Sequence, residues 1–332
     1  MEKRYLVLIT VIAGLLFLGS CQNGTFTLFA SPTPSITTSP TSTQTYTPTN
    51  TLQPTITPTP TVTPLVPAFE HIIVIVLENK EFDTVIGNPD MPQFNAWAED
   101  YALLTQHYAI LHPSLPNYIA LLSGDTQGIT SNCSQCFIDA PSLPDLLEDV
   151  GLTWRAYMEG MPEPCFIGDS VTYFQKHDPF IYFDDIRLNP ERCQNIVPMT
   201  QMEIDLSNND LANFIFITPD ICNDAHDCGL QIADDWLGYW VNRLLENPEI
   251  ADNSLIIITW DEGQGEHTCC GLTTGGGRIA TLLISTRVQP GFWDDTPYTH
   301  YSILRTIATA WGLPLLGHAA DPETNLIQVP WN

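Results

Sequence analysis

Polar side chains that could bind a metal ion follow three short apolar segments of this 332-residue chain. They are Glu78 and Asn79 after residues 71–77, the stretch 220–227 with His226 after residues 213–218, and Asp261 and Glu262 after residues 254–260. Carboxylate, amide and imidazole groups of this kind suit a divalent cation, with Ca²⁺, Mg²⁺, Mn²⁺ and Zn²⁺ as the candidates. The alternative is that the acids only form turns and helix caps. The presence of three such clusters favours the metal site.

A serine at the start of a predicted helix adds a second chemical group. Ser114 lies in the segment HPSLPNY, residues 112–118, just before an apolar run. A helix N-terminus offers N–H groups that can hold phosphate, and a serine placed there could serve only as the cap. A nearby metal ion could instead lower the pKa of the hydroxyl and make it a nucleophile. The spacing alone leaves both interpretations open.

The apolar segments also predict the elements that bring these groups together. Residues 71–77, 213–218, 254–260 and 279–285 lack clean alternation, which is typical of strands covered on both faces. Helices are predicted at residues 93–101, 115–122, 231–246 and 299–311. This alternation predicts an α/β fold, with a doubly wound, mostly parallel sheet flanked by helices. Ligands of such sheets bind outside the carboxyl ends of the strands, so we expect the polar clusters to share one edge.

The N-terminal residues 1–21 are typical of a lipoprotein signal peptide. Lys3 and Arg4 precede an apolar stretch of about 14 residues, which is shorter than a bilayer-spanning helix requires. The tetrad Leu-Gly-Ser-Cys that ends at Cys21 resembles the lipobox of bacterial lipoproteins, whose cysteine carries the lipid. An ordinary signal peptide and an uncleaved anchor are the alternatives. We expect an extracytoplasmic protein that is lipid-anchored to the membrane of the cell envelope through Cys21.

Composition divides the rest of the chain into a stalk and a single domain. Residues 22–69 contain no charged side chain, and Thr, Pro and Ser occupy 26 of the 34 positions in 31–64. This composition predicts a disordered stalk. Residues 70–332 contain 37 acidic and nine basic residues and no second Pro/Ser/Thr-rich break, so we expect one domain.

The net charge of −27 restricts the partners of the protein. Nucleic acid is excluded, because its phosphates are held by Lys and Arg, which are scarce here. An acidic surface also repels anionic ligands at long range, so a site that processes anions needs a local positive centre.

Cysteine usage agrees with export from the cytoplasm. Setting Cys21 aside leaves eight of the nine cysteines. Three pairs are predicted disulfides: Cys133/Cys136, Cys165/Cys193 and Cys222/Cys228. Adjacent Cys269 and Cys270 could bond to each other, remain reduced or bridge elsewhere. A thiolate zinc site is disfavoured, because the spacings do not match a zinc ribbon.

Taken together, the motifs resemble the bacterial phosphoesterase family that joins acid phosphatases and C-type phospholipases, within the alkaline phosphatase-like superfamily. The matching segments are residues 71–87, 112–124, 218–227, 259–263 and 300–317. They span nearly all of residues 70–332 in the expected order, and this ordered set is more specific than any single motif. The resemblance implies an alkaline phosphatase-like fold and hydrolysis of phosphate esters.

The resemblance also implies a metal site with a serine nucleophile. The metal ligands that it implies are Glu78, Asn79, Ser114, Asp261 and Glu262. Ser114 would transiently carry the phosphoryl group. Glu262 departs from the family pattern, which often has a second aspartate at this position.

Further residues are predicted to contact the substrate. By the resemblance, His226 would contact the phosphate or assist the leaving group, and Asn117 would donate a hydrogen bond to a phosphate oxygen. His107 and His112 flank the Ser114 segment and could reach the phosphate, or His107 could instead be packed in a core strand. Many relatives have a histidine where this chain has Arg278, so either Arg278 or His267 would supply the positive charge.

The predicted function is metal-dependent hydrolysis of phosphate monoesters, lipid phosphates included, through a serine-phosphate intermediate. The acidic domain favours activity at low pH, as in an acid phosphatase. A phosphodiesterase of the phospholipase C type is the alternative, although relatives with that activity tend to be longer. A non-catalytic lipoprotein that binds a phosphoryl ligand is disfavoured, because such a protein has no need of a nucleophile.

Overall fold

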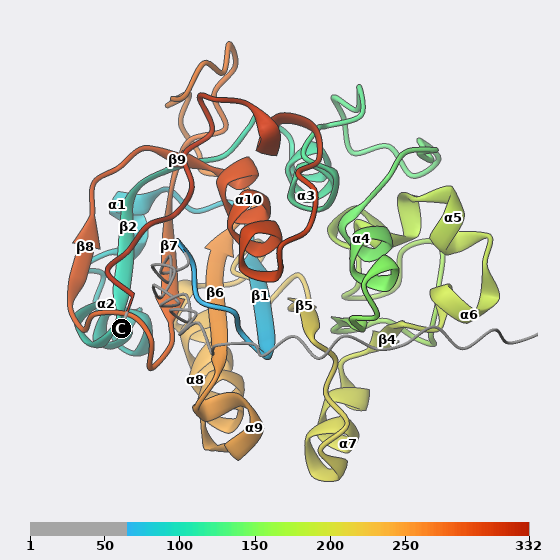
Figure 1. Cartoon of the computed structure of the whole chain (residues 1–332), viewed down its shortest axis with the longest axis horizontal. Helices are drawn as coiled ribbons and strands as arrows, with labels where there is room; N and C mark the ends of the chain where they lie inside the picture. Colours follow the sequence, from blue (N-terminus) through green and yellow to red (C-terminus); the bar gives the residue numbers. More distant parts are fainter. Residues whose placement is uncertain (1–64, 332) are drawn as a thin grey trace, which may run out of the picture. The chain divides into compact units, whose positions relative to one another are not determined.

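A nine-stranded sheet forms the centre of the computed structural model, which describes residues 65–331 (Figure 1). The strand order is β4-β3-β5-β1-β6-β7-β2-β8, with β9 paired to β2. The strands are β1 His71–Leu77, β2 Ala102–Tyr108, β3 Trp154–Met158, β4 Ile196–Pro198, β5 Phe214–Thr218, β6 Ser254–Trp260, β7 Arg278–Ile284, β8 Phe292–Asp294 and β9 Tyr298–Thr299. The predicted signal peptide and residues 22–64 of the predicted stalk lie outside the described residues.

Most neighbouring strands of the sheet run parallel, as predicted. β1 pairs in parallel with β5 on one side and with β6 on the other, and β3 continues the parallel set beside β5. β7 is the exception, because it runs antiparallel to both β6 and β2. The chain therefore turns back after β6 through residues 261–277, and this loop stays at the carboxyl end of β6.

Helices cover both faces of the sheet. The α-helices are α1 Phe82–Val85, α2 Pro92–Asp100, α3 Ser114–Ser123, α4 Leu143–Asp149, α5 Asp184–Arg187, α6 Pro190–Cys193, α7 Thr200–Asn208, α8 Leu230–Glu246, α9 Pro248–Ala251 and α10 His300–Trp311. Short 3₁₀ helices are η1 Gln175–His177, η2 Phe180–Tyr182 and η3 Gly317–Ala320. The predicted helices correspond to α2, α3, α8 and α10.

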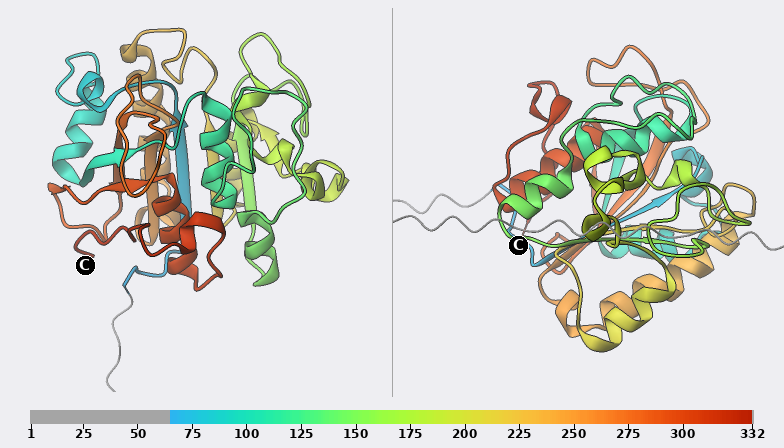
Figure 2. Two further views of the ribbon diagram at one scale, coloured as in Figure 1. Left: turned by 90° about the horizontal axis from the view of Figure 1, so that it is seen from above. Right: turned by 90° about the vertical axis from the view of Figure 1, so that its right-hand side faces the viewer.

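Alternate residues of β1 divide the core into two layers. Ile72, Val74 and Val76 face the layer that contains α3, α4 and α10, whereas Ile73 and Ile75 face the layer of α2, α7 and α8. Figure 2 shows these two helical layers on opposite sides of the sheet. Because every residue of β1 is buried, the strand has no polar face, and its sequence is continuously apolar.

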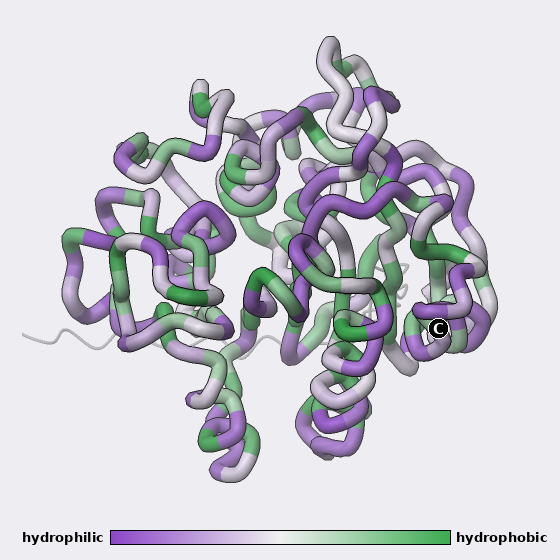
Figure 3. The backbone as a smooth tube through the Cα atoms, turned by 180° about the vertical axis from the view of Figure 1, so that it is seen from behind, coloured by the Kyte–Doolittle hydropathy of each residue, from purple (hydrophilic) through white to green (hydrophobic). Residues whose placement is uncertain are grey.

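Hydropathy along the backbone agrees with this layered core. Hydrophobic segments run through the centre of the fold, and hydrophilic segments are concentrated in the outer loops (Figure 3). Within residues 65–331, no helix combines the length and the apolar character that crossing a membrane requires.

Four disulfides connect loops within residues 65–331. They join Cys133 to Cys136, Cys165 to Cys193, Cys222 to Cys228 and Cys269 to Cys270. The three predicted pairs are confirmed. The open question about the adjacent cysteines is answered by a bond between them.

Candidate active site

Three adjacent parallel strands place the predicted polar clusters together at the carboxyl ends of the strands. Because β1 lies between β5 and β6, the segments that follow these strands start side by side. The backbone connects them directly: Glu78 N–H donates to the Asp224 carbonyl at 2.9 Å, and Asp261 N–H donates to the Leu77 carbonyl at 2.9 Å. The predicted shared edge is therefore present.

Glu78 lies at the centre of this edge and is completely buried. Its Oε2 accepts hydrogen bonds from Asn79 Nδ2 at 3.0 Å and from Ser114 Oγ at 3.2 Å. Its Oε1 accepts a hydrogen bond from the Tyr118 hydroxyl and lies 3.2 Å from His177 Nε2. Burial, together with the nearby Asp261 and Asp224, raises the pKa of this carboxyl well above its ordinary value.

Ser114 is the first residue of α3 and points at two carboxylates. Its Oγ lies 3.2 Å from Glu78 Oε2 and 3.2 Å from Glu262 Oε1. The segment that delivers it is fixed by Asn117, whose Oδ1 accepts the Ile110 and Leu111 N–H groups. Ser114 is therefore held between two acidic groups and does not serve only as a helix cap. The preceding residue, Pro113, occupies the N-cap position and forms no side-chain cap hydrogen bond.

The two acids after β6 take different positions. Asp261 is completely buried, and its Oδ1 accepts the backbone N–H of Asn79 at 3.0 Å. Asn79 adopts a left-handed backbone with φ of 54°, which turns the chain sharply after β1. Glu262 bonds to Ser114 and to His112 Nδ1, so it sits beside the nucleophile candidate.

Two residues that sequence analysis did not assign to the site complete it. Glu78, His177 and Asp224 each offer one ligand atom, and the three atoms lie within 4.8 Å of one another. His177 Nδ1 lies 3.5 Å from Asp224 Oδ2, and both residues are buried. His177 belongs to no motif of the sequence analysis, and β3, the short strand upstream of it, contains Arg155 and was not among the predicted strands. Asp224 lay inside the predicted 220–227 cluster but was not singled out from it.

The charge of the cluster calls for a cation. Burial raises the pKa of Asp224 to about 8 and that of Asp261 to about 7, and it also raises the pKa of Glu262. Burial lowers the pKa of His177 well below its ordinary value, which favours the neutral form that binds metals. Asp224 Oδ2 and Asp261 Oδ2 are buried without a hydrogen-bond partner among the described residues. Buried oxygens of this kind, next to a neutral imidazole, fit a divalent metal ion.

Two histidines lie at the rim of the cluster. His112 is partly exposed, and its ring contacts Glu262 and the Gly265 carbonyl; although burial opposes it, these contacts raise the pKa of His112. His226 is also partly exposed, bonds to Asp227 at 2.7 Å, and has its ring centroid 6.4 Å from that of His177. Both imidazoles are therefore accessible from solvent beside the buried carboxylates.

Asn117 does not have the predicted contact with phosphate. Its Oδ1 accepts from two backbone N–H groups, and its Nδ2 donates to the Leu111 carbonyl at 2.6 Å and the Pro113 carbonyl at 3.3 Å. The side chain is completely buried. Its hydrogen-bonding groups are used to shape residues 110–113, so the structure places Asn117 as a support for this segment.

His107 and Arg278 also point elsewhere. His107 is completely buried in β2, where its Nδ1 bonds to Thr281 Oγ1 at 2.7 Å. The Arg278 guanidinium bonds to Asp83 at 2.7 Å and lies over the Phe82 ring. Both side chains are engaged outside the carboxylate cluster: His107 takes the core-strand position that the sequence left open, and Arg278 pairs with Asp83.

His267 is not a substitute for Arg278. Its Nδ1 bonds to Glu81 Oε1 at 3.0 Å, and most of the side chain is exposed. Glu81 also accepts the N–H groups of Gln264, Gly265 and Arg278, so it anchors the base of the loop after β6. Neither Arg278 nor His267 therefore supplies a positive charge to the carboxylate cluster in this structure.

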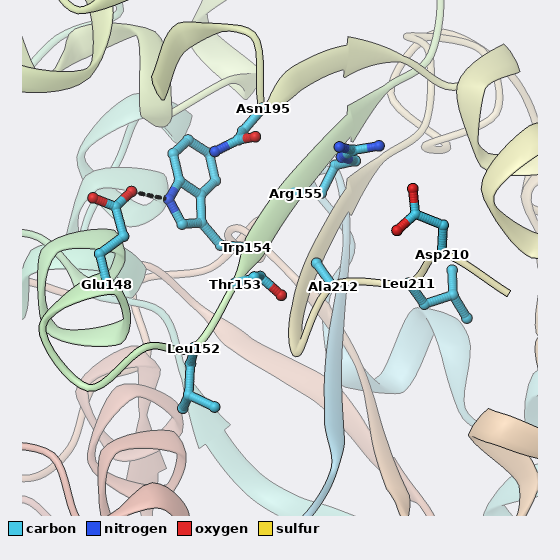
Figure 4. A pocket seen from close by; sticks show the side chains of 9 residues that line it. All are labelled: Glu148, Leu152, Thr153, Trp154, Arg155, Asn195, Asp210, Leu211 and Ala212. Atoms are coloured by element: carbon cyan, nitrogen blue, oxygen red, sulfur yellow. Dashed lines mark hydrogen bonds between the residues drawn. The ribbon is translucent and has the colours of Figure 1, made fainter. Parts of the chain in front are cut away.

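A separate pocket of about 230 Å³ lies at the opposite end of the strands, where β3 and β5 begin. Figure 4 shows its lining, in which the Trp154 indole donates a hydrogen bond to Glu148. The pocket lies at the start of β3 and just before β5, away from the strand ends that carry the carboxylates. It contains none of the predicted site residues.

Comparisons with known proteins agree with this architecture. A model of the phosphoesterase family matches residues 88–314. The chain is 32% identical over 277 residues to an acid phosphatase of Aspergillus fumigatus, covering 80% of this chain and 60% of that protein. It is 31% identical over 270 residues to a phosphatidylinositol-3-phosphatase of Mycobacterium tuberculosis, covering 79% of this chain and 84% of that protein. The chain thus spans about 60% of the length of the fungal enzyme that it matches.

A solved structure shows the same fold. The crystal structure of a protein in the alkaline phosphatase superfamily from Vibrio parahaemolyticus superposes with a TM-score of 0.54 at 14% identity. The match covers 78% of this chain and 72% of that one. The predicted fold class is therefore confirmed.

Proposed function

Because this chain belongs to the phosphoesterase family, we propose that it hydrolyses phosphate monoesters through a serine-phosphate intermediate on Ser114. The observation that carries the proposal is the position of Ser114 Oγ, 3.2 Å from the carboxylates of both Glu78 and Glu262. The names of the relatives, acid phosphatase and phosphatidylinositol-3-phosphatase, support a phosphomonoester as the substrate and make a lipid phosphate a candidate.

The buried cluster fits a divalent metal ion, and the proposal includes one. Glu78, His177 and Asp224 would hold it, with the free Oδ2 of Asp261 beside them. This set shares only Glu78 with the ligands predicted on sequence, because His177 and Asp224 stand in place of Asn79, Ser114, Asp261 and Glu262. When bound, the ion supplies positive charge that stabilises phosphoryl oxygens and lowers the pKa of a nearby hydroxyl.

The residues of the chain account for the movement of protons. Ser114 Oγ bonds to phosphorus, and its proton passes to Glu262, whose other oxygen is held by His112. The ester oxygen leaves and takes a proton from His226. Water then attacks the phosphoserine and returns its proton to His226, while Ser114 regains its own from Glu262. The products are the alcohol and inorganic phosphate.

A turnover assay tests this proposal directly. The full-length protein, purified with its disulfides formed, is assayed with p-nitrophenyl phosphate and with p-nitrophenyl phosphorylcholine at pH 5 and pH 8. We compare wild type, chelator-treated wild type and Ser114→Ala. Ser207→Ala is the matched control, because this exposed serine bonds only to the Glu203 carbonyl on α7.

The outcomes separate the three functions considered. Monoester turnover that is lost with chelator and with Ser114→Ala, but kept by Ser207→Ala, supports the phosphatase. A preference for the choline diester would replace it with a phospholipase C-type activity. Absence of turnover in a protein that retains metal would leave a binding lipoprotein.

We further propose that the enzyme acts outside the cytoplasm, anchored through Cys21. The lipobox-like tetrad and the four disulfides support this location. Expression of the chain in a bacterium fed a labelled fatty acid should label the wild type and not Cys21→Ser. Equal labelling of both proteins would contradict the anchor.

A further inference from the structure

The described site contains several carboxyl groups, whose ionised forms repel a phosphate ester. Glu78, Asp224, Asp261 and Glu262 all lie at the edge where the nucleophile candidate stands. A divalent ion offsets part of this charge, but a dianionic phosphoryl group brings further negative charge. A fixed protein cation that contacts the phosphoryl oxygens would favour binding.

The N-terminus of α3 contributes little to that need. The Leu115 N–H, next to Ser114, donates to Asn132 Oδ1 at 3.0 Å. The next residue, Pro116, has no N–H at all. The helix end predicted to hold the phosphate therefore has few donors left.

Most Lys and Arg side chains donate to protein acceptors, including Lys80, which lies beside the carboxylate cluster and donates to the Ala225 carbonyl at 2.7 Å. The described residues contain nine of them. Eight donate hydrogen bonds to protein acceptors: Lys80 to Ala225, Arg155 to Asp205, Arg187 to Asp184, Arg192 to Asp145, Arg243 to Glu203, Arg278 to Asp83, Arg287 to Asn253 and Arg305 to Asp321. The ninth, Lys176, has no hydrogen-bond partner among residues 65–331.

Lys176 lies at the site. It is the middle residue of η1 and directly precedes His177, whose Nε2 is 3.2 Å from Glu78. Its side chain is partly exposed, whereas its neighbours Gln175 and His177 are buried. Its positive charge interacts electrostatically with Glu78 and Glu262, the two carboxylates that flank Ser114 Oγ.

The short turn that carries Lys176 is fixed from both sides. The Gln175 side chain donates to the Ser134 carbonyl at 2.9 Å, inside the Cys133–Cys136 loop. The Gln175 N–H donates to Asp169 at 2.9 Å. The backbone on which the free ammonium group stands is therefore positioned, and only the side chain has room to adjust.

We infer that Lys176 is a substrate-positioning residue that binds a non-bridging oxygen of the phosphoryl group beside Ser114. This inference rests on the proposed function. Lys176, on η1, would supply the positive charge near the phosphate that the sequence had suggested for Arg278 or His267. The ligand class is any phosphoryl dianion, including the product, inorganic phosphate.

Kinetics and binding of full-length variants test the inference. We compare wild type, Lys176→Met, Lys176→Arg and the control Arg287→Gln, whose arginine lies at the opposite edge of the sheet beside Asn253. For each protein, KM and kcat are measured with p-nitrophenyl phosphate, and the affinity for inorganic phosphate is measured by calorimetry. Thermal melting shows that each variant is folded.

Loss of a charge-assisted hydrogen bond predicts that Lys176→Met raises KM and the phosphate Kd by about 10- to 100-fold, with a smaller change in kcat. Lys176→Arg should restore most of the affinity, and Arg287→Gln should match wild type. Wild-type KM and phosphate affinity retained by a folded Lys176→Met would overturn the inference. If wild type itself binds phosphate but turns over no ester, the proposed function fails while the phosphate affinities still test Lys176.

Discussion

His177 Nε2 lies 3.2 Å from Glu78 Oε1, although the two residues are 99 positions apart in the sequence. The contact joins the end of β1 to η1, and Asp224 completes the group from the segment after β5. The candidate metal centre is thus made of three loops, each of which follows a different strand of the parallel sheet. This arrangement is expected where ligands bind at the carboxyl ends of strands.

The first prediction concerns that contact. His177→Ala should reduce the affinity for a divalent ion at least tenfold, because it removes one of three clustered ligands, and even supporting residues around metal sites typically change affinity by about 10–100-fold. Calorimetric titration of metal-free protein with Mn²⁺ and with Zn²⁺ measures the loss. His318→Ala is the control, since that histidine pairs with Asp321 on the surface. Equal affinity in His177→Ala and wild type would remove His177 from the centre.

The parts of the site that were predicted follow long, fully buried strands. β1 and β6 are fully buried and mostly apolar, so their ends were visible in the sequence, and with them Glu78, Asn79, Asp261 and Glu262. β5 likewise pointed to the segment that contains Asp224 and His226. Here the sequence pattern and the sheet topology lead to the same place.

The parts that were missed depend on contacts that no local pattern records. β3 is five residues long and contains the half-buried Arg155, so it lacked the apolar signature, and the path to His177 was lost with it. Asn117 was predicted to bind phosphate because the sequence around it does not show how its amide is engaged. In the structure this amide forms four hydrogen bonds to backbone groups. Arg278 occupied a position of interest in the sequence, but its side chain turns toward Asp83 and Phe82.

The second prediction is that the metal-free protein becomes less stable as the pH rises. Burial raises the pKa of Asp224 to about 8 and of Asp261 to about 7, above the ordinary value of an unfolded aspartate, near 4. Between these limits the folded state binds more protons than the unfolded state, so stability falls as pH rises from about 4 to 8. We expect metal-free protein to melt at least about 3 °C higher at pH 5 than at pH 8, since 1 kcal/mol corresponds to roughly 2–4 °C in a domain of this size.

Metal provides the control for this pH dependence. A bound divalent ion favours the ionised carboxylates, so saturating metal should stabilise the protein more at pH 8 than at pH 5. Differential scanning calorimetry with and without chelator measures both effects. A metal-free protein that is more stable at pH 8 would show that the buried carboxylates are not the dominant titrating groups.

The third prediction concerns Arg278. Arg278→Ala should leave kcat/KM within about threefold of wild type and cost no more than about 1–2 kcal/mol of stability. The guanidinium contacts an exposed Asp83 and the face of Phe82, and partly exposed pairs of this kind contribute little. Steady-state kinetics and urea unfolding check the two values. A loss of 100-fold or more in a folded Arg278→Ala would return this residue to the substrate site.

The fourth prediction tests Asn117 as a scaffold residue. Asn117→Ala should destabilise the fold by roughly 2–3 kcal/mol, because it leaves buried N–H and C=O groups of residues 110–113 without partners. Activity should fall together with stability, since the same segment delivers Ser114. Chemical unfolding followed beside kcat and KM distinguishes this from phosphate binding. An unchanged stability with a raised KM alone would support the original prediction of a phosphate contact.

The last prediction concerns the Cys133–Cys136 loop, which touches both sides of the site. Asn132, the residue before Cys133, accepts the Leu115 N–H beside the nucleophile candidate, and the Ser134 carbonyl inside the loop accepts a hydrogen bond from the Gln175 side chain beside Lys176. Replacing both cysteines by serine should therefore raise KM by about three- to tenfold through loss of positioning. The loss in unfolding free energy should be small, because the two cysteines are only three positions apart in the sequence. A disulfide that closes so short a loop stabilises the folded state little.

Comparison with a second disulfide makes this test specific. Cys165→Ser with Cys193→Ser removes a bond that closes a loop with a sequence separation of 28, so it should lower the melting temperature more and raise KM less. Kinetics and melting of the two double variants are measured side by side. If removal of Cys133–Cys136 leaves KM unchanged, the loop is not needed to hold Lys176 and Ser114 in register. If both variants raise KM equally, the effect comes from general loss of stability and not from the contacts of this loop.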